Sequence, residues 1–404
     1  MKIKIEDEKV IATTIMVCLV IMAIFAAVTG GRSLFQKEDR KLKIGFVYIG
    51  DAGNPYTANF IRAENQIREK FPEAEIETRN NVPESNCEPY IRSLAEAGCD
   101  LIFTTSFGYE DFVKKVAAEY PEIEFCHATG TKANADPLPN YHTFMGAIHE
   151  GRYLTGVVAG LKLAEMLQQG VISADQARIG YVAAFPYAEV ISGYTAFLLG
   201  VRSIVPKAVM DVRYTNTWSE YKLEKVIAKE FIEDGCVIIS QHSDTIGPAI
   251  ACEESEEDHP VYHVGYNISM LDVAPTTELV SSTINWAPYM LQAVDAVKHG
   301  LPIERHLKAK VKGKDACGGL KEGWVELREI NHMTMAKGTE GKLQFLIRDI
   351  EAGKLNIFSG NYVGRDPEDP TDTISLRTTY EECAEGSAPS FHYVLDDVIR
   401  VLDD

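Results

Sequence analysis

Residues 43–50 read KIGFVYIG, and residues 178–185 read RIGYVAAF, which is a second version of the same apolar run. Three further pairs follow in the same order and at a nearly constant offset: PEAEIETR (72–79) with PKAVMDVR (206–213), GCDLIFTTS (98–106) with GCVIISQHS (235–243), and PEIEFCH (121–127) with PVYHVGY (260–266). Four copied segments in register predict two lobes of one topology. We expect Gly45 to superpose on Gly180, and Ser106 on Ser243.

Each copied segment is a short run of Val, Ile, Phe and Tyr bounded by Gly, Pro or polar residues, which is typical of a buried strand. Helical patterns lie between these strands, at residues 57–70, 87–97, 109–120 and 223–233. Strands that alternate with helices form parallel βαβ units. The predicted fold class is therefore α/β, with two doubly wound parallel-sheet lobes and a hinged cleft between them.

The repeat also sets the expected domains. We expect residues 41–150 to form lobe 1, completed by part of 285–404, and residues 151–284 to form lobe 2. Residues 361–404 are a C-terminal extension, in which 390–402 is predicted as a final helix.

The N-terminal 40 residues are expected to be a signal or anchor segment with a short linker. Residues 11–30 contain no charge and are long enough to cross a hydrocarbon core as a helix. The segment is therefore either a signal peptide or an uncleaved membrane anchor. Basic residues lie on both sides of it, so the positive-inside rule does not decide its orientation. We expect the protein at the extracytoplasmic face of the cell membrane, anchored or secreted.

Composition excludes several classes of protein. The 404 residues include 40 Lys+Arg and 59 Asp+Glu, a formal net charge of −19 that disfavours binding to nucleic acid. Among the eight cysteines no Cys-x-x-Cys occurs, which argues against zinc-ribbon and thioredoxin sites. Cys317 and Cys383 are one possible bridge, but sequence alone leaves the pairing open.

The loops at the carboxyl ends of the predicted strands are the expected ligand site, because these ends converge at one edge of a parallel sheet. Aromatic residues there suit a planar ligand, and polar residues suit its edges. The ligand-binding candidates are Asp51, Tyr56, Asn59, Ser106, Phe107, Phe185, Gln241, His242, Asn267 and Trp286. The aromatic residues could instead pack the core or the lobe interface, and Asp51 and Asp244 could cap helices.

Motifs for catalysis and metal binding are absent from the sequence. It contains no G-x-S-x-G, Walker A, H-E-x-x-H or G-x-G-x-x-G pattern. His259 and His263 have the spacing of a metal pair on a helix, but Pro260 disfavours a helix there. We therefore expect no catalytic residue, no metal and no cofactor.

Six blocks carry a resemblance to a known family: KIGFVYIGDAG (43–53), EGRYLTG (150–156), GYVAAFPYAEV (180–190), NTW (216–218), QHSD (241–244) and NWAPY (285–289). Over residues 41–360 the chain resembles the basic membrane protein (BMP) family of substrate-binding lipoproteins, in its purine- or nucleoside-binding branch. Asn54 stands where that branch often has Trp, and Asn267 stands where Asp is usual. The resemblance implies a type I periplasmic-binding fold, a purine base or nucleoside as ligand, and an ABC importer as partner.

Two other classes of function stay open beside this receptor. The first is a nucleoside-processing hydrolase on the same two-lobed scaffold, using Asp51 or Asp244. The second is a sensor domain that reports its ligand to a membrane partner without transport. Fold alone does not separate these from a transport receptor.

Overall fold

The computed structural model describes residues 41–135 and 137–402. The predicted signal or anchor segment at residues 1–40 lies outside the described residues. Among the helices that are described, none combines the length and the apolar character needed to cross a membrane.

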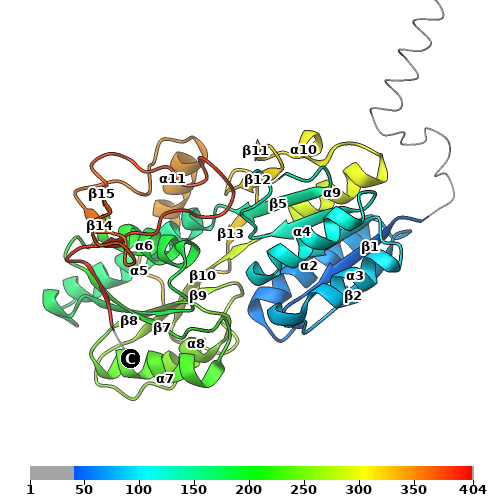
Figure 1. Ribbon diagram of the computed structural model, residues 1–404. Helices are drawn as coiled ribbons and strands as arrows, with labels where there is room; N and C mark the ends of the chain where they lie inside the picture. Colours follow the sequence, from blue (N-terminus) through cyan, green and yellow to red (C-terminus); the bar gives the residue numbers. More distant parts are fainter. Residues whose placement is uncertain (1–40, 136, 403–404) are drawn as a thin grey trace, which may run out of the picture. The chain divides into compact units, whose positions relative to one another are not determined.

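A seven-stranded sheet forms the centre of lobe 1 (Figure 1). In spatial order its strands are β11 (Lys310–Lys312), β12 (Asp315–Gly318), β5 (Tyr141–Gly146), β4 (Glu124–Ala128), β3 (Leu101–Thr104), β1 (Lys43–Val47) and β2 (Glu75–Arg79). β11 pairs antiparallel with β12, and the other neighbours are parallel.

Helices cover both faces of this sheet because its strands are apolar on both faces. Phe46 points into a cluster with α2 (Pro55–Lys70) and α9 (Ala287–Lys298). Ile102 points into a cluster with α3 (Glu88–Glu96) and α4 (Glu110–Glu119) on the opposite face. The short helices are η1 (Glu84–Asn86), η2 (Phe107–Tyr109) and α10 (Ile303–His306).

A second seven-stranded sheet forms the centre of lobe 2. In spatial order its strands are β13 (Val325–Leu327), β10 (Glu278–Ile284), β9 (Tyr262–Tyr266), β8 (Ile238–His242), β6 (Arg178–Ala183), β7 (Val209–Tyr214) and β17 (Ile399–Val401). β13 pairs antiparallel with β10, and the other neighbours are parallel. Strands β13 and β17 come from beyond residue 284, so lobe 2 is assembled from separate parts of the chain.

The helices of lobe 2 repeat the arrangement of lobe 1. Helices α5 (Ile148–Gln168) and α6 (Ala188–Arg202) cover one face of the sheet, and α7 (Tyr221–Glu233) and α8 (Gly247–Glu253) cover the other. Helix α11 (Thr339–Glu351) packs against α5. A short helix, η3 (Ala174–Gln176), precedes β6.

The predicted internal repeat agrees with the topology of the two sheets. The order β5-β4-β3-β1-β2 in lobe 1 matches the order β10-β9-β8-β6-β7 in lobe 2. Gly45 lies opposite Ile102 of β3, and Gly180 lies opposite Ile239 of β8. The four predicted helices are present as α2, α3, α4 and α7, and the two doubly wound lobes are confirmed.

The predicted helix at 390–402 is wrong. The segment instead contains β16 (Val394–Leu395) and β17, separated by a turn in which Asp397 has φ of 64°. A left-handed residue ends any helix, and the flanking β-branched residues favour strands. β16 joins a three-stranded sheet with β14 (Val363–Arg365) and β15 (Thr373–Ser375), whereas β17 extends the sheet of lobe 2.

Helices α5 and α6 approach each other at two glycines. A Cβ atom on Gly156 would lie 2.0 Å from the carbonyl oxygen of Phe197, and one on Gly200 would lie 2.1 Å from that of Tyr153. Both obstructing atoms belong to the backbone, so a side-chain rotation would not relieve the clash. The core of lobe 2 therefore depends on the absence of side chains at these two positions.

We predict that Gly156→Ala lowers the free energy of unfolding by roughly 2–3 kcal/mol, because two packed helices would have to separate. The matched control is Gly341→Ala in α11, where a Cβ would meet nothing within 4 Å. That change should stabilise the protein by about 0.5–1 kcal/mol through helix propensity. Urea titration followed by circular dichroism measures both. Equal midpoints for the two variants would contradict the prediction.

Candidate functional site

A cavity of about 780 Å³ lies at the carboxyl ends of the parallel strands, with residues of both lobes in its wall. Lobe 1 contributes residues that follow β1, β2, β3 and β4, and lobe 2 contributes residues at or after the carboxyl ends of β6, β7, β8 and β9. Its lining includes Asp51, Tyr56, Ser106, Phe107, Glu189, Trp218, Glu220, His242, Asp244 and Tyr266. The cavity thus lies where the two sheets were expected to bind a ligand.

Five of the ten predicted ligand-binding residues line this cavity: Asp51, Tyr56, Ser106, Phe107 and His242. The other five are absent from its lining: Asn59, Phe185, Gln241, Asn267 and Trp286. These five lie behind lining residues or between the lobes. Their predicted direct contact with a ligand stays a prediction.

The loop after β1 is held by its own polar side chains. Asn54 caps α2, because its Oδ1 accepts a hydrogen bond from the backbone N–H of Thr57 at 2.9 Å. Asp51 accepts hydrogen bonds from the Gly53 N–H at 2.9 Å and from the Asn81 amide at 3.1 Å. These bonds, first that from Gly53, lower the pKa of Asp51. Asp51 is therefore an anion at the rim of the cavity.

Trp286 lies in the core of lobe 1, with 2% of its surface exposed. Its ring stacks on Phe60 with centroids 4.4 Å apart and meets the edge of Tyr56 at 6.4 Å. Tyr56 lines the cavity and donates a hydrogen bond from its hydroxyl to the Thr105 carbonyl at 2.5 Å. Trp286 therefore supports the position of a lining ring.

Phe185 has a comparable place in lobe 2. It stacks on Tyr187 with centroids 5.0 Å apart and meets Trp218 edge-on, also at 5.0 Å. Trp218, whose ring lines the cavity, belongs to the NTW block but was not among the predicted site residues. Across the cleft, Phe107 of lobe 1 lies 5.4 Å from Tyr187. Aromatic rings from both lobes therefore meet at the mouth of the cleft.

A buried cation lies behind the lobe 2 wall. The guanidinium of Arg152, on α5, is 3.7 Å from the centroid of the Tyr266 ring and donates to the Gln241 carbonyl at 2.9 Å. Burial, and secondarily Arg152, lowers the pKa of His242 to about 4, although Glu189 acts in the opposite direction. The imidazole of His242 is therefore neutral at pH 7 and offers one donor and one acceptor.

Asp244 is the second titratable group in this wall. Burial raises its pKa well above the usual range, and the nearby Glu224 and Glu189 raise it further. Its Oδ1 accepts a hydrogen bond from the Asn267 amide at 2.8 Å. A carboxyl group with such a raised pKa keeps its proton more readily and can then donate a hydrogen bond as well as accept one.

Gln241 and Asn267 shape the loops of this wall. The Gln241 amide donates to the carbonyls of Ser243 and Thr245 at 2.9 and 2.7 Å, and its oxygen is 3.1 Å from His263 Nε2. The backbone of Asn267 is left-handed, with φ of 69°. Asn tolerates this conformation better than most residues, which gives the position a structural reason for an amide side chain.

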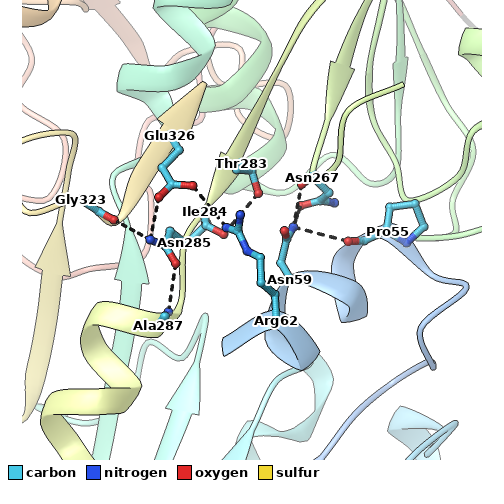
Figure 2. Close-up of polar contacts among 10 residues, drawn as sticks. All are labelled: Pro55, Asn59, Arg62, Asn267, Thr283, Ile284, Asn285, Ala287, Gly323 and Glu326. Carbon is cyan, nitrogen blue, oxygen red and sulfur yellow. Dashed lines mark hydrogen bonds and ion pairs between the residues drawn. The ribbon is translucent and has the colours of Figure 1, made fainter. Parts of the chain in front are cut away.

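The two lobes are joined by polar contacts beside the cavity (Figure 2). The Asn59 amide, on α2 of lobe 1, donates to the Asn267 carbonyl of lobe 2 at 2.9 Å. Arg62, one turn further along α2, forms an ion pair with Glu326 of β13 at 3.3 Å. Glu326 also accepts from the Asn285 amide at 2.7 Å. Asn59 is thus a link between the lobes.

One group of side chains could supply ligands to a metal ion among the described residues. Oxygen and nitrogen atoms of Asp366, Asp372 and His392 lie within 4.8 Å of one another. All three belong to the C-terminal extension and are absent from the cavity lining. Near-surface acidic groups often come together without a metal, so the cluster alone assigns no function.

Comparison with known proteins gives a consistent result. Residues 41–351 match the family model Bmp, described as ABC transporter substrate-binding protein PnrA-like. A purine-binding protein of Brucella abortus is 32% identical over 85% of this chain and 89% of its own. A Haloferax volcanii protein described as an ABC transporter glucose-binding protein is 30% identical over 65% of this chain and 63% of its own.

Solved structures show the same fold. An ABC transporter solute-binding protein of Aeropyrum pernix has a TM-score of 0.65 at 15% identity, over 78% of this chain and 92% of that one. One from Conexibacter woesei has a TM-score of 0.60 at 17% identity, over 78% and 97%. The type I periplasmic-binding fold is therefore confirmed.

We predict that Asn59→Ala shifts the ligand-free protein toward a more open arrangement of the lobes. The change removes the hydrogen bond from the Asn59 amide to the Asn267 carbonyl. This should destabilise the arrangement in which the lobes touch by about 1 kcal/mol, which shifts the opening equilibrium roughly fivefold. Small-angle X-ray scattering should show a larger radius of gyration. The control is Lys115→Ala, which breaks an ion pair with Glu88 inside lobe 1. An unchanged scattering curve for Asn59→Ala would refute the inter-lobe role.

Proposed function

The chain belongs to the Bmp family of PnrA-like ABC transporter substrate-binding proteins, and we propose that its cleft binds an uncharged purine base or nucleoside for import. Members of this family are extracytoplasmic, bind a small molecule and work with an ABC permease. The relative from Brucella abortus is named as a purine-binding protein. The ligand and the transport step of this chain are our proposal.

The observation that carries the proposal is the pairing of aromatic rings with neutral polar groups in one cavity. Tyr56 and Phe107 line it from lobe 1, and Trp218 and Tyr266 from lobe 2. A planar heterocycle gains about 0.5–1.5 kcal/mol from each such ring beyond the burial of its surface. Because closure brings the two lobes together, a ring stacked on both would favour the closed state.

The polar groups of the wall match the edge of a purine. That edge carries donors and acceptors side by side. Neutral His242 offers one of each, and Asp244 does the same while it keeps its proton. A buried edge group left without a partner costs about 1–3 kcal/mol, so these residues should select among purines.

Charge in the cavity disfavours nucleotides. Asp51, Glu189 and Glu220 line it, whereas none of its described lining residues is Lys or Arg. A phosphate group would enter an acidic site with no cation in its wall to pair with it. The proposed ligand therefore lacks a phosphate.

A simple sugar is the second candidate, since the Haloferax volcanii relative is described as glucose-binding and carboxylates on aromatic walls also suit sugar hydroxyls. The nucleoside-processing hydrolase and the ligand sensor without transport also stay open. Calorimetry with purines and sugars separates the first two candidates, and chemical analysis of the ligand after incubation detects turnover. Loss of purine uptake in cells that lack the protein would separate transport from sensing.

We predict binding of adenine, adenosine, guanosine or inosine by isothermal titration calorimetry, and at least tenfold weaker binding of AMP than of adenosine. Ribose and glucose serve as controls for the sugar alternative. Binding of glucose without any purine would overturn the ligand assignment and leave the receptor fold. Chromatography of the solution recovered from the calorimeter tests for catalysis. Intact ligand after incubation agrees with a receptor, whereas a reaction product would support the hydrolase.

We predict that Trp218→Ala weakens binding of the best purine at least tenfold, a change of about 1.4 kcal/mol, because it removes a lining ring. The matched control is Phe345→Ala on α11, an aromatic side chain that is 51% exposed and absent from the cavity lining. Phe185→Ala and Trp286→Ala test the sequence-based prediction of direct contact. Unchanged affinity in Trp218→Ala would show that the ligand binds elsewhere.

A further inference from the structure

The C-terminal strap, defined here as residues 361–402, is built on lobe 2. Its strand β17 pairs in parallel with β7, and Arg400 forms two hydrogen bonds to Asp211 of β7 at 2.6 and 2.7 Å. Phe391 and Leu395 are fully buried in the same apolar cluster as helices α5 and α6. Strand β17 of the strap is therefore part of the lobe 2 sheet, and the buried apolar residues of the strap are part of the lobe 2 core.

The middle of the strap reaches lobe 1. Glu381 pairs with Lys310 of β11 at 3.3 Å, and Glu385 pairs with Lys312 of the same strand. The backbone N–H of Ser387 donates to the buried Asp315 of β12 at 2.6 Å. The strap thus contacts the β11–β12 hairpin at the edge of the lobe 1 sheet while its ends stay on lobe 2.

Two cysteines meet where the strap touches this hairpin. Cys317 on β12 and Cys383 on the strap are 6% and 7% exposed, and they form a small buried cluster with Ala147. The neighbouring Cys317 thiol, and then burial, raise the pKa of Cys383 well above its usual range. The Cys383 thiol donates to the Ser387 carbonyl at 3.7 Å. Cys126, by contrast, accepts a hydrogen bond from the Tyr289 hydroxyl. The contact between Cys317 and Cys383 is therefore between two thiols that come from different lobes.

The pair also lies beside the hinge. Ala147 joins β5 of lobe 1 to α5 of lobe 2, and Cys317 lies just before the chain crosses from β12 to β13. In the described chain these are two of the crossings between the sheets, and the third runs from β10 to α9. A bond between the two sulfurs would add a covalent link that the backbone does not provide.

We propose that Cys317 and Cys383 form a disulfide that fastens the C-terminal strap to lobe 1 at the hinge. A bridge here joins two segments that are already folded against each other, so it needs little rearrangement. It keeps the strap seated on the β11–β12 hairpin as the lobes move. Family members work outside the cytoplasm, where protein disulfides form and persist.

The bond forms by thiol–disulfide exchange with a small disulfide oxidant, such as oxidised glutathione. One protein thiolate attacks a sulfur of the oxidant, and the other half of the oxidant leaves as a thiol after taking up a proton. The second protein thiolate then attacks the mixed disulfide and releases the remaining half as a thiol. Both electrons pass to the oxidant. A cavity of about 300 Å³ lined by Cys317, Cys383 and Glu150 lets the oxidant approach.

The first test is peptide mapping of the natural full-length chain under non-reducing conditions. After equilibration with oxidised glutathione we expect the peptides of Cys317 and Cys383 to be joined, with a mass two hydrogens below their sum. The link should disappear after dithiothreitol. Recovery of Cys317 and Cys383 as free thiols or as glutathione adducts from the oxidised, folded protein would overturn the proposal.

The second test is thermal unfolding with and without dithiothreitol. Reduction should lower the Tm of the natural protein by roughly 5 °C. Cys383→Ser should abolish this shift, whereas Cys252→Ala, a buried cysteine of another cluster, should keep it. A shift that persists in Cys383→Ser would contradict the proposal. If Cys383→Ser does not fold, the peptide map of the natural chain still decides. Neither test uses a ligand, so failure here is distinct from failure of the purine proposal.

Discussion

The common direction of the parallel strands is the constraint on which the rest of this structure depends. In each lobe the loops after the central strands must all leave at the same edge of the sheet. The two sheets have the same strand order, so each lobe presents an equivalent set of loops. Asp51, Ser106 and His242 reach one cavity for this reason, although they are far apart in the sequence.

Much of this arrangement could be predicted from the copied strands, because buried parallel strands leave continuous apolar runs in the sequence. The prediction of a helix at residues 390–402 was wrong, because the sequence pattern of a short segment does not reveal that a residue such as Asp397 has a left-handed backbone conformation. Tyr56 and Phe107 could be placed at the cavity from their position after a strand. Trp286 could not be placed in this way, since its burial against Phe60 depends on how α9 docks against α2.

The wall of the cleft contains both carboxylates and hydrogen-bonding groups that burial keeps uncharged. The protein has a net charge of −19, and Glu189 and Glu220 bring part of it into the cavity. Behind this wall a single guanidinium, that of Arg152, stacks on Tyr266 and opposes protonation of His242. The cleft therefore repels anions at its surface while its buried hydrogen-bonding groups stay uncharged, a combination suited to neutral polar molecules.

Strand β17 has a consequence for the order in which the chain can fold. The sheet of lobe 2 begins in the sequence with β6, near residue 178. One of its edge strands is β17, residues 399–401, which pairs with β7. After synthesis of only the first three hundred residues, the sheet of lobe 2 therefore still lacks both of its edge strands, β13 and β17, and β10 and β7 are left unpaired on their outer sides. Lobe 2 completes its sheet only after residue 401 has emerged.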